Sequence, residues 1–478
     1  MNILFQEPLV ERKITFGKFY KGAGNNTFSC GIADMAGYIR ERGYNVSYLE
    51  PSIEKFDTTK YLKYLSLGNF RVIGIGSTTL QINKTISTFK LIKKNHPNIT
   101  TVLGGVHGSI MSEETLRSTS CIDYIILGEG EKPFFELLEC IKSKQFKKIK
   151  NIEGIAFKEG EKIIINKPNF NNFLNSENLP IPAYDIFPMN KYISQATYTK
   201  KYPSFSITCS RGCAFNCAFC CASSISGRKV RYKSINKLIN EIILLKKVYN
   251  AKGLMFHDST FTLNNQWVED FCKALIKRKI NMPWSCNSRV DTVNEKLLKL
   301  MKQSGCWEIL FGIESANQKS LDLIRKGTTV EQNTETLKMS MRLGIYTYAS
   351  YILCLPHETK EDAMNTIMYA KKIATPIAIF YLPTPYPKTE LWNICKKQGG
   401  LRNGASWSDC NLWDTSKLAY INPLIGEEVM KKILNYSYVS YYSNPIVLIK
   451  NLKEILFLKQ SPRKFLYALS ALIGYVKK

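Results

Sequence analysis

Five of the chain's 14 cysteines lie between positions 209 and 221, and their spacing predicts a metal site. Cys213, Cys217 and Cys220 form the pattern C-x3-C-x2-C directly after a predicted strand, with Cys209 and Cys221 on either side. Thiolates this close together in one loop can bind iron or zinc. Three ligands would leave one iron of a four-iron cluster open to an outside molecule. A structural zinc ion needs four ligands, and Cys209 or Cys221 could supply the fourth.

Glycine-rich stretches at the ends of three predicted strands are the second candidate for chemistry. They cover residues 76–79, 104–108 and 128–131. The carboxyl ends of parallel strands meet at one edge of a sheet, where α/β proteins bind their ligands. Because glycine lets the backbone approach a ligand closely, these stretches predict a binding site at that edge.

The elements that must position these residues alternate between short apolar strands and amphipathic helices, which is typical of an α/β fold. Over residues 1–145 we expect a doubly wound, Rossmann-like parallel sheet, with strands at 2–5, 46–50, 71–76, 100–105 and 124–131 and helices at 30–43, 81–95 and 131–143. Residues 146–200 are predicted to be a linker with two short strands near 152–157 and 162–166.

The alternation resumes over residues 201–398 and predicts a partial (β/α)6 TIM-like barrel. Its strands are expected at 205–208, 253–258, 282–287, 308–314, 346–353 and 376–382, and its helices at 234–249, 264–278, 294–304, 330–343 and 360–374. By analogy with complete barrels, the active site should lie at the carboxyl ends of the strands. Residues 399–478 lack the alternation and are predicted to be helical.

The cysteine pattern, with Phe219 before its last cysteine and Ser210-Arg211-Gly212 before its first, resembles the radical S-adenosylmethionine (radical SAM) superfamily. The resemblance covers roughly residues 200–395 and includes later strand motifs at 256–261, 284–291, 312–315 and 324–327. Two motifs depart from the family, because His357 and Lys388 stand where it usually has glycine. Both departures concern the substrate pocket rather than the cluster.

This resemblance implies a 4Fe-4S cluster held by Cys213, Cys217 and Cys220. The cluster would bind S-adenosylmethionine and cleave it with one electron, supplied by a flavodoxin or ferredoxin. The resulting 5′-deoxyadenosyl radical would take hydrogen from an unactivated carbon. Phe219 would pack on the adenine, and Arg289 and Glu314 would contact the nucleoside or the carboxylate.

The first 145 residues are similar to the cobalamin-binding domains that precede this barrel, through the segments 104–107 and 123–131. This similarity implies cobalamin-dependent methyl transfer to carbon, with ring formation or rearrangement as other outcomes. The family signature D-x-H-x-x-G is missing, which implies a cobalt without a protein histidine. His107 is then either a contact to the lower face of cobalamin or a loop histidine bonded to the backbone, and a domain that has lost its cobalamin also fits. The residues expected to contact cobalamin are Gly104, Gly105, His107, Gly128, Glu129 and Gly130.

Composition restricts the partners and the location. The 66 Lys and Arg against 39 Asp and Glu give a net charge of +27, dispersed as a lysine-rich surface, so a nucleic-acid partner is not expected. The start of the chain lacks the features of a signal peptide, and the apolar run 465–476 is too short to span a bilayer. We expect a cytoplasmic enzyme acting on a small molecule or a lipid.

The last part of the chain leaves two interpretations open. Residues 444–478 carry seven basic residues and one acidic residue at roughly helical spacing with apolar positions. They either pack on the barrel or lie at an anionic membrane surface as a peripheral contact.

Two other functions were weighed. A transfer-RNA methylthiotransferase would need three grouped cysteines in the first domain, but Cys30, Cys121 and Cys140 are far apart. It would also need a small β-barrel at the end of the chain, where helices are predicted. A non-catalytic cobalamin or iron–sulfur sensor would not need the strand motifs that resemble nucleoside-binding segments.

Overall fold

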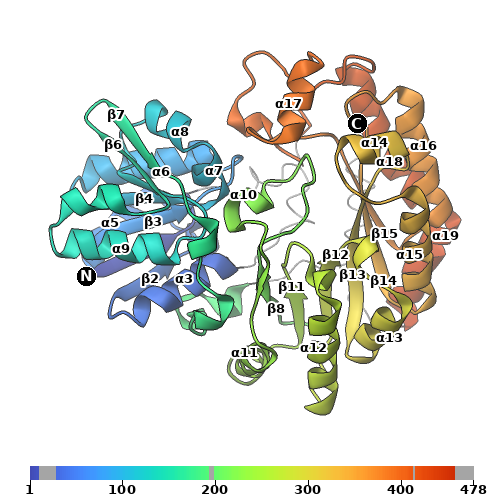
Figure 1. The fold of residues 1–478 in the computed structure, drawn as a ribbon, viewed down its shortest axis with the longest axis horizontal. Helices are drawn as coiled ribbons and strands as arrows, with labels where there is room; N and C mark the ends of the chain where they lie inside the picture. Colours follow the sequence, from blue (N-terminus) through green and yellow to red (C-terminus); the bar gives the residue numbers. More distant parts are fainter. Residues whose placement is uncertain (10–27, 193–198, 413–414, 458–478) are drawn as a thin grey trace.

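The computed structural model describes residues 1–9, 28–192, 199–412 and 415–457, which form two α/β units side by side (Figure 1). The first unit is built on parallel strands in the order β2-β1-β3-β4-β5. These are β1 (Asn2–Gln6), β2 (Asn45–Leu49), β3 (Phe70–Gly76), β4 (Thr100–Gly104) and β5 (Tyr124–Ile126). The order confirms the predicted doubly wound sheet.

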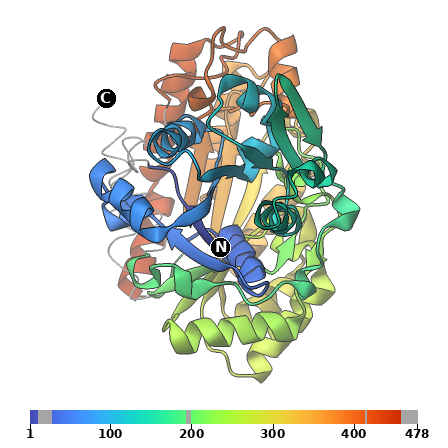
Figure 2. The ribbon, with the colours of Figure 1, turned by 90° about the vertical axis from the view of Figure 1, so that its left-hand side faces the viewer.

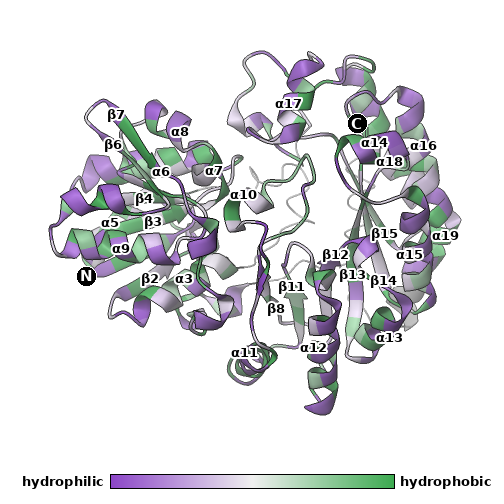
Figure 3. Cartoon of the chain, viewed as in Figure 1, coloured by the Kyte–Doolittle hydropathy of each residue, from purple (hydrophilic) through white to green (hydrophobic). Residues whose placement is uncertain are grey.

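Helices cover both faces of this first sheet. On one face, α3 (Cys30–Arg40) and α9 (Glu131–Lys142) pack on Val72 and Val102. On the other face, α5 (Thr58–Gly68) and α6 (Ile82–Asn95) pack on Ile73 and Leu103. Strands that are buried on both faces have nearly continuous apolar sequences, and these runs made the strand positions predictable from the sequence. Figure 3 shows both sheets in hydrophobic colours beneath helices with one polar side.

The region around β5 differs from the prediction. The strand ends at Ile126 instead of residue 131, and the next residues form a turn through Gly128, whose φ is +73°, before α9 begins. The short helices α7 (Gly105–Ile110) and α8 (Ser112–Ser118) follow β4 and were not predicted. The two strands expected in the linker, β6 (Ile155–Glu159) and β7 (Lys162–Asn166), form an antiparallel hairpin that extends the first sheet beyond β5.

The second unit contains the predicted strand–helix repeats. Its parallel sheet runs in the order β15-β14-β13-β12-β11-β8, and its two end strands are not paired with each other in the described residues. The strands are β8 (Ser204–Ile207), β11 (Gly253–Phe256), β12 (Trp284–Ser288), β13 (Cys306–Glu314), β14 (Tyr346–Ile352) and β15 (Ile377–Tyr381). Turned by 90°, the first unit lies in front of this sheet (Figure 2). This open arrangement is the expected partial barrel.

Each helix of these repeats begins at a side chain that accepts a hydrogen bond from the first helical turn. The capping residues are Ser234, Asn264, Asn294, Thr329 and Thr359. Such caps satisfy backbone N–H groups that have no partner within the helix. The helices are α11 (Ile235–Val248), α12 (Asn265–Lys277), α13 (Glu295–Gln303), α15 (Val330–Arg342) and α16 (Lys360–Ile373).

The region after residue 398 is helical only in part. Helices α18 (Glu427–Tyr442) and α19 (Pro445–Phe457) are present, but most of residues 401–426 are irregular, unlike the prediction. Helix α18 covers the edge strand β15: the Tyr438 hydroxyl donates to the carbonyl of Phe380 (3.0 Å) and accepts from its N–H (3.2 Å). Tyr442 does the same at Ala378, so backbone groups of the edge are satisfied. Among the described helices, none has both the length and the apolarity needed to cross a bilayer.

Candidate functional site

The cysteine loop follows β8 and is fixed by backbone contacts at both ends. Gly212 has φ +100°, and a Cβ there would lie 2.5 Å from the carbonyl oxygen of Lys229, so the position requires glycine. The N–H of Cys213 donates to Gly227 (3.1 Å), and the N–H of Ala218 donates to Ile324 (2.8 Å). These contacts fix the two ends of the loop against neighbouring segments of the barrel unit.

The three predicted cluster ligands belong to this loop and are free thiols. Burial raises the pKa of the Cys217 thiol, although the nearby Lys326 and Arg289 lower it, and burial raises the pKa of Cys220 to about 11. Two N–H groups point at these sulfurs: Arg289 Nη1 lies 3.6 Å from Cys217 Sγ, and the Ala222 N–H lies 3.5 Å from Cys220 Sγ. Hydrogen bonds to a thiolate favour the metal-bound form.

Cys209 is not positioned as a fourth ligand. It is fully buried, and its Sγ donates to Asp258 Oδ1 over 3.2 Å. The same carboxylate accepts from the N–H groups of Cys209 and Ser210 and thereby fixes the turn that leads into the loop. Within the described ranges, no three His, Cys, Asp or Glu side chains are grouped as a ready site for one metal ion. The engagement of Cys209 with Asp258 disfavours its use as the fourth ligand of a closed zinc site.

Arg289 lies at the carboxyl end of β12 and is 5% exposed. Its guanidinium lies 3.7 Å over the ring of Phe215, inside the cysteine loop, and donates to both carboxylate oxygens of Asp291 (2.9 and 2.7 Å). It also donates to the carbonyl of Lys326 (2.6 Å). These contacts hold the loop against the barrel, and the predicted contact with S-adenosylmethionine stays a prediction.

Glu314, at the end of β13, forms a buried ion pair that the sequence did not predict. Lys326 Nζ donates to Glu314 Oε1 over 2.7 Å, and both side chains are less than a tenth exposed. A Cβ on Gly312 would lie 2.4 Å from that carboxylate oxygen, so glycine makes room for the pair. Glu314 has φ +67°, a strained backbone of the kind found at functional sites. Phe219 is half-buried beside Ile352 and Ile394.

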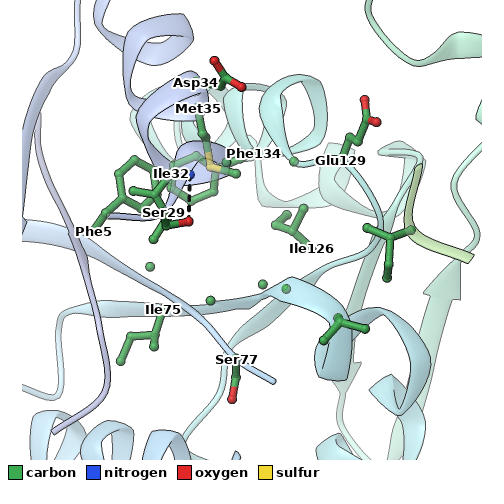
Figure 4. Close-up of a pocket in the computed structure, with 18 of the residues that line it drawn as sticks. Phe5, Ser29, Ile32, Asp34, Met35, Ile75, Ser77, Ile126, Glu129 and Phe134 are labelled. Carbon is green, nitrogen blue, oxygen red and sulfur yellow. Dashed lines mark hydrogen bonds between the residues drawn. The ribbon is translucent and has the colours of Figure 1, made fainter. Parts of the chain in front are cut away.

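A cavity of about 430 Å³ lies at the carboxyl edge of the first sheet. Its volume is typical of a ligand pocket. Figure 4 shows its wall, which is apolar along the strands and carries carboxylates at one side. Residues of the barrel unit complete it, among them Thr208, Arg211 and Ile225. Its apolar wall includes Phe5, Ile32, Met35, Ile75, Val102, Ile126 and Phe134.

The predicted glycines have different roles around this cavity: some face open space, and others are required by the backbone conformation or by close packing. A Cβ on Gly104 or Gly76 would meet no atom within 4 Å and would point into open space. Gly105 instead has φ +83°, and its Cβ would lie 2.7 Å from the backbone of Ser77. Gly128 has φ +73° and packs near Phe173, while Gly130 lies against Met35. Gly76 and Gly104 therefore leave space that a ligand can fill, and Gly104 is the one of these two that was expected to contact cobalamin.

His107 is not among the residues that line this cavity, and its predicted contact with cobalamin stays a prediction. It is fully buried in α7, with Nδ1 3.3 Å from the Thr79 hydroxyl and Nε2 3.1 Å from the Thr115 hydroxyl. Its ring packs edge-on against Trp407 at 4.7 Å. Burial lowers the pKa of this imidazole to about 4. Both nitrogens are occupied, so the residue is structural.

Two other histidines and Lys388 lie at strand ends of the barrel. His257 follows β11, and its side chain is exposed at the end of that strand. His357 and Lys388 have φ of +67° and +61°, the conformation that glycine adopts without strain. Lys388 contacts Glu114 of the first unit at 3.1 Å. The two departures from the family motifs therefore occupy positions that favour glycine.

Comparison with known proteins identifies the family. Residues 22–138 match the family model "B12 binding domain", and residues 207–370 match "Radical SAM superfamily". An uncharacterized methyltransferase of Pyrococcus horikoshii is 33% identical over 455 residues, which is 95% of each chain. The chain belongs to the cobalamin-binding radical SAM enzymes.

Two further comparisons support this assignment. An anaerobic magnesium-protoporphyrin IX monomethyl ester cyclase of Rubrivivax gelatinosus is 29% identical over 406 residues, covering 84% of this chain and 70% of the cyclase. The structure of the radical SAM methyltransferase TsrM from Kitasatospora setae with cobalamin and a 4Fe-4S cluster bound has a TM-score of 0.70 at 15% identity, covering 92% and 88% of the two chains. This radical SAM enzyme therefore shares that fold along most of its length.

The residues present fit the cofactors of the family, which are S-adenosylmethionine, a 4Fe-4S cluster and cobalamin. The donor set of Cys213, Cys217 and Cys220 suits iron–sulfur chemistry, and Arg289 supports one of its sulfurs. The space above Gly76 and Gly104 suits an apolar part of a large cofactor. Sequence reasoning missed the roles of Arg211, Asp258 and Lys326, because each acts through partners distant along the chain.

Proposed function

We propose that this enzyme methylates an unactivated carbon in a cobalamin-dependent radical SAM reaction. The observation that carries the proposal is the shared wall between the two sites: Arg211, two residues before the first cluster cysteine, also lines the cavity beside Gly104. When bound, the cluster with S-adenosylmethionine supplies an organic radical, and cobalamin supplies the methyl group. Ring formation, the activity named for the Rubrivivax cyclase, is the second candidate.

The chain's own residues would bind and orient these groups. Cys213, Cys217 and Cys220 hold the cluster, and Lys326 and Arg289 place positive charge beside Cys217. Phe219, Arg289 and Glu314 bind S-adenosylmethionine at the carboxyl ends of the strands. Gly104, Gly105, Gly128, Glu129 and Gly130 shape the cobalamin site, without a histidine on cobalt. His257 is exposed at the end of β11 and is available to contact the substrate.

The substrate is proposed to be apolar, either a lipid or a polycyclic compound. Helix α19 supports this, because Ile446, Ile449 and Leu452 are between 44% and 53% exposed on the described surface. Together with the basic residues of the last segment, they would form a peripheral contact with an anionic membrane. The other apolar residues predicted to enter the membrane boundary, Ile455, Leu456, Phe465 and Leu466, belong to the same segment 444–478 and lie beyond the described side chains. Vesicles of increasing anionic content should co-sediment the enzyme at low salt, and an absence of binding would favour a soluble substrate.

The methylthiotransferase alternative receives little support from the structure. Cys30, Cys121 and Cys140 lie on α3, before β5 and on α9, and the described residues after 398 contain helices and an isolated bridge rather than a sheet. Burial raises the pKa of each of these thiols. No second cluster site is formed by the described part of the first unit.

The test is anaerobic reconstitution with iron, sulfide and hydroxocobalamin, followed by addition of S-adenosylmethionine and a flavodoxin or ferredoxin as reductant. We expect about one cobalamin per chain, a reductively cleaved S-adenosylmethionine, and methyl transfer when candidate lipids or polycyclic compounds are supplied. Electron spin resonance of the reduced cobalamin should show no nitrogen from a histidine. A folded protein that binds the cluster but no cobalamin would overturn the proposal.

A further inference from the structure

Arg211 connects the two halves of the site through a buried ion network. Its Nη2 lies 2.8 Å from Asp34 Oδ2 and 2.7 Å from Glu131 Oε1, and its Nη1 lies 3.4 Å from Glu129 Oε2. The guanidinium is 14% exposed and the carboxylates are 8% exposed or less.

The carboxylates all belong to the wall of the cobalamin cavity. Asp34 lies on α3, Glu129 on the turn after β5, and Glu131 at the start of α9, and each of them lines the cavity. Arg211 lies on the short strand β9 (Ser210–Arg211), and its neighbour Gly212 leads directly to Cys213. One side chain thus joins three elements of the cavity to the start of the cysteine loop.

A second arginine shares part of this network and provides a comparison. Arg231, on β10 (Arg231–Tyr232), pairs with Arg211 across a two-residue antiparallel ladder. It binds Glu129 through both nitrogens but has no ion pair with Asp34 or Glu131 among the described residues. Its place in the chain is eleven residues after Cys220, outside the cluster motif.

We propose that Arg211 is a positioning residue that couples cobalamin binding to the order of the cysteine loop. The inference rests on the proposed function, because it assumes that cobalamin fills the cavity and a cluster binds the cysteines. A ligand that fixes α3 and the β5–α9 turn also fixes the partners of Arg211, and through them the entry to Cys213. A cluster that fixes the loop favours the same arrangement of the cavity wall. Linkage requires each cofactor to strengthen the binding of the other by the same factor.

The experiment compares hydroxocobalamin affinity with and without the cluster, measured anaerobically by absorbance titration. In the wild-type enzyme we expect the reconstituted cluster to lower the Kd at least about fivefold, the lower end of common coupling factors. In Arg211→Gln the ratio of the two Kd values should fall to about one. The matched control Arg231→Gln should keep the wild-type ratio, although it also removes a buried cation. The reciprocal readout is the rate at which a chelator removes iron, which hydroxocobalamin should slow in wild type and Arg231→Gln but not in Arg211→Gln.

Arg211→Gln leaves buried carboxylates without a counter-ion, which is strongly destabilising. The double variant Arg211→Gln/Glu131→Gln keeps the net charge and should also show a Kd ratio near one. A wild-type ratio of one, or a ratio that survives in both variants, would overturn the coupling. If hydroxocobalamin binds the wild-type enzyme in neither state, the proposed function fails and the coupling fails with it.

Discussion

The cysteine loop and the cobalamin cavity meet at Arg211 but are built in opposite ways. The loop carries its three ligands within eight consecutive residues, and the barrel fixes it through short backbone contacts. The cavity takes its wall from α3, four strand ends, α9 and the barrel unit, so no short segment contains it. A small number of side chains, Arg211 and Arg289 above all, hold the loop in place.

Because of this difference, the two sites should lose their function through different kinds of substitution. Loss of one cysteine removes a ligand that Cys209 cannot replace, because the Cys209 thiol is engaged with Asp258. The cavity instead depends on space, and its most sensitive positions are those where a glycine faces a void. Removing a cysteine thiol should therefore abolish cluster binding at the loop, whereas adding side-chain volume at a glycine should abolish ligand binding in the cavity.

The largest effect is expected for Ala at Cys213, Cys217 or Cys220. Each substitution should abolish the cluster absorbance and the cleavage of S-adenosylmethionine, because a three-ligand cluster has no spare thiolate. Iron content and 5′-deoxyadenosine formation measure the two losses. Cys209→Ala and Cys221→Ala are the controls and should keep both. If Cys209→Ala lost the cluster as completely, the ligand assignment would be wrong.

A large but selective effect is expected for Gly104→Leu. The residue has φ −128° and ψ −167°, which any residue adopts, and its new side chain would enter the cavity without meeting protein. We expect hydroxocobalamin affinity to fall at least about 100-fold through overpacking, while the cluster and the cleavage of S-adenosylmethionine persist. Gly104→Ala should show a smaller loss in the same titration. Equal affinity in Gly104→Leu and wild type would place cobalamin elsewhere.

A moderate effect is expected from His107, which supports the cavity from within α7. Its pKa is depressed from 6.5 to about 4 in the folded state, so the unfolded chain binds the additional proton. Stability from this group is complete above pH 6.5 and declines as the pH falls toward 4, with a loss of about 2 kcal/mol by pH 5. His107→Gln, which can still bond both threonines, should flatten this part of the stability curve in denaturant titrations. His96→Gln is the control, and an unchanged curve for His107→Gln would contradict the assigned cause.

The smallest effect is expected for Arg289→Lys. Lysine keeps the charge but loses the planar fork that binds Asp291 and stacks on Phe215. We expect a chelator to remove the cluster iron about tenfold faster, a typical cost for a residue that supports a metal ligand. Arg278→Lys on α12 should leave the rate unchanged. A wild-type rate in Arg289→Lys would show that Arg289 does not hold the loop and would leave its role to S-adenosylmethionine.

Much of this molecule followed from local patterns. Apolar runs with strand or helix periodicity located the strands of both sheets and most of their helices, because each element must bury its own apolar face. The cysteine spacing predicted the cluster loop, since a loop of eight residues brings its ligands together without help from the rest of the chain. The glycines at the strand ends predicted the edge at which the cavity lies.

Other features depended on contacts between distant residues. The β6–β7 hairpin was expected in a linker but extends the first sheet, because only the folded chain offers it the free edge of β5. His107 was predicted to be either a cobalamin contact or a loop histidine bonded to the backbone. It is enclosed by Thr79, Thr115 and Trp407, and the last of these comes from a segment 300 residues later. The spacing of apolar and polar residues along the sequence does not indicate which distant side chains will surround a histidine.

The sequence by itself indicated the fold class and the family and predicted the cluster ligands, because short hydrogen-bonded elements and a contiguous cysteine motif are encoded locally. The tertiary structure decided which glycine faces a void, which histidine is structural and which arginine links the two sites. Arg211 and Asp34 are 177 residues apart in the chain and 2.8 Å apart in space. Contacts of this kind are decided by how the two units pack, because burying a charge is favourable only where the packing also brings a partner.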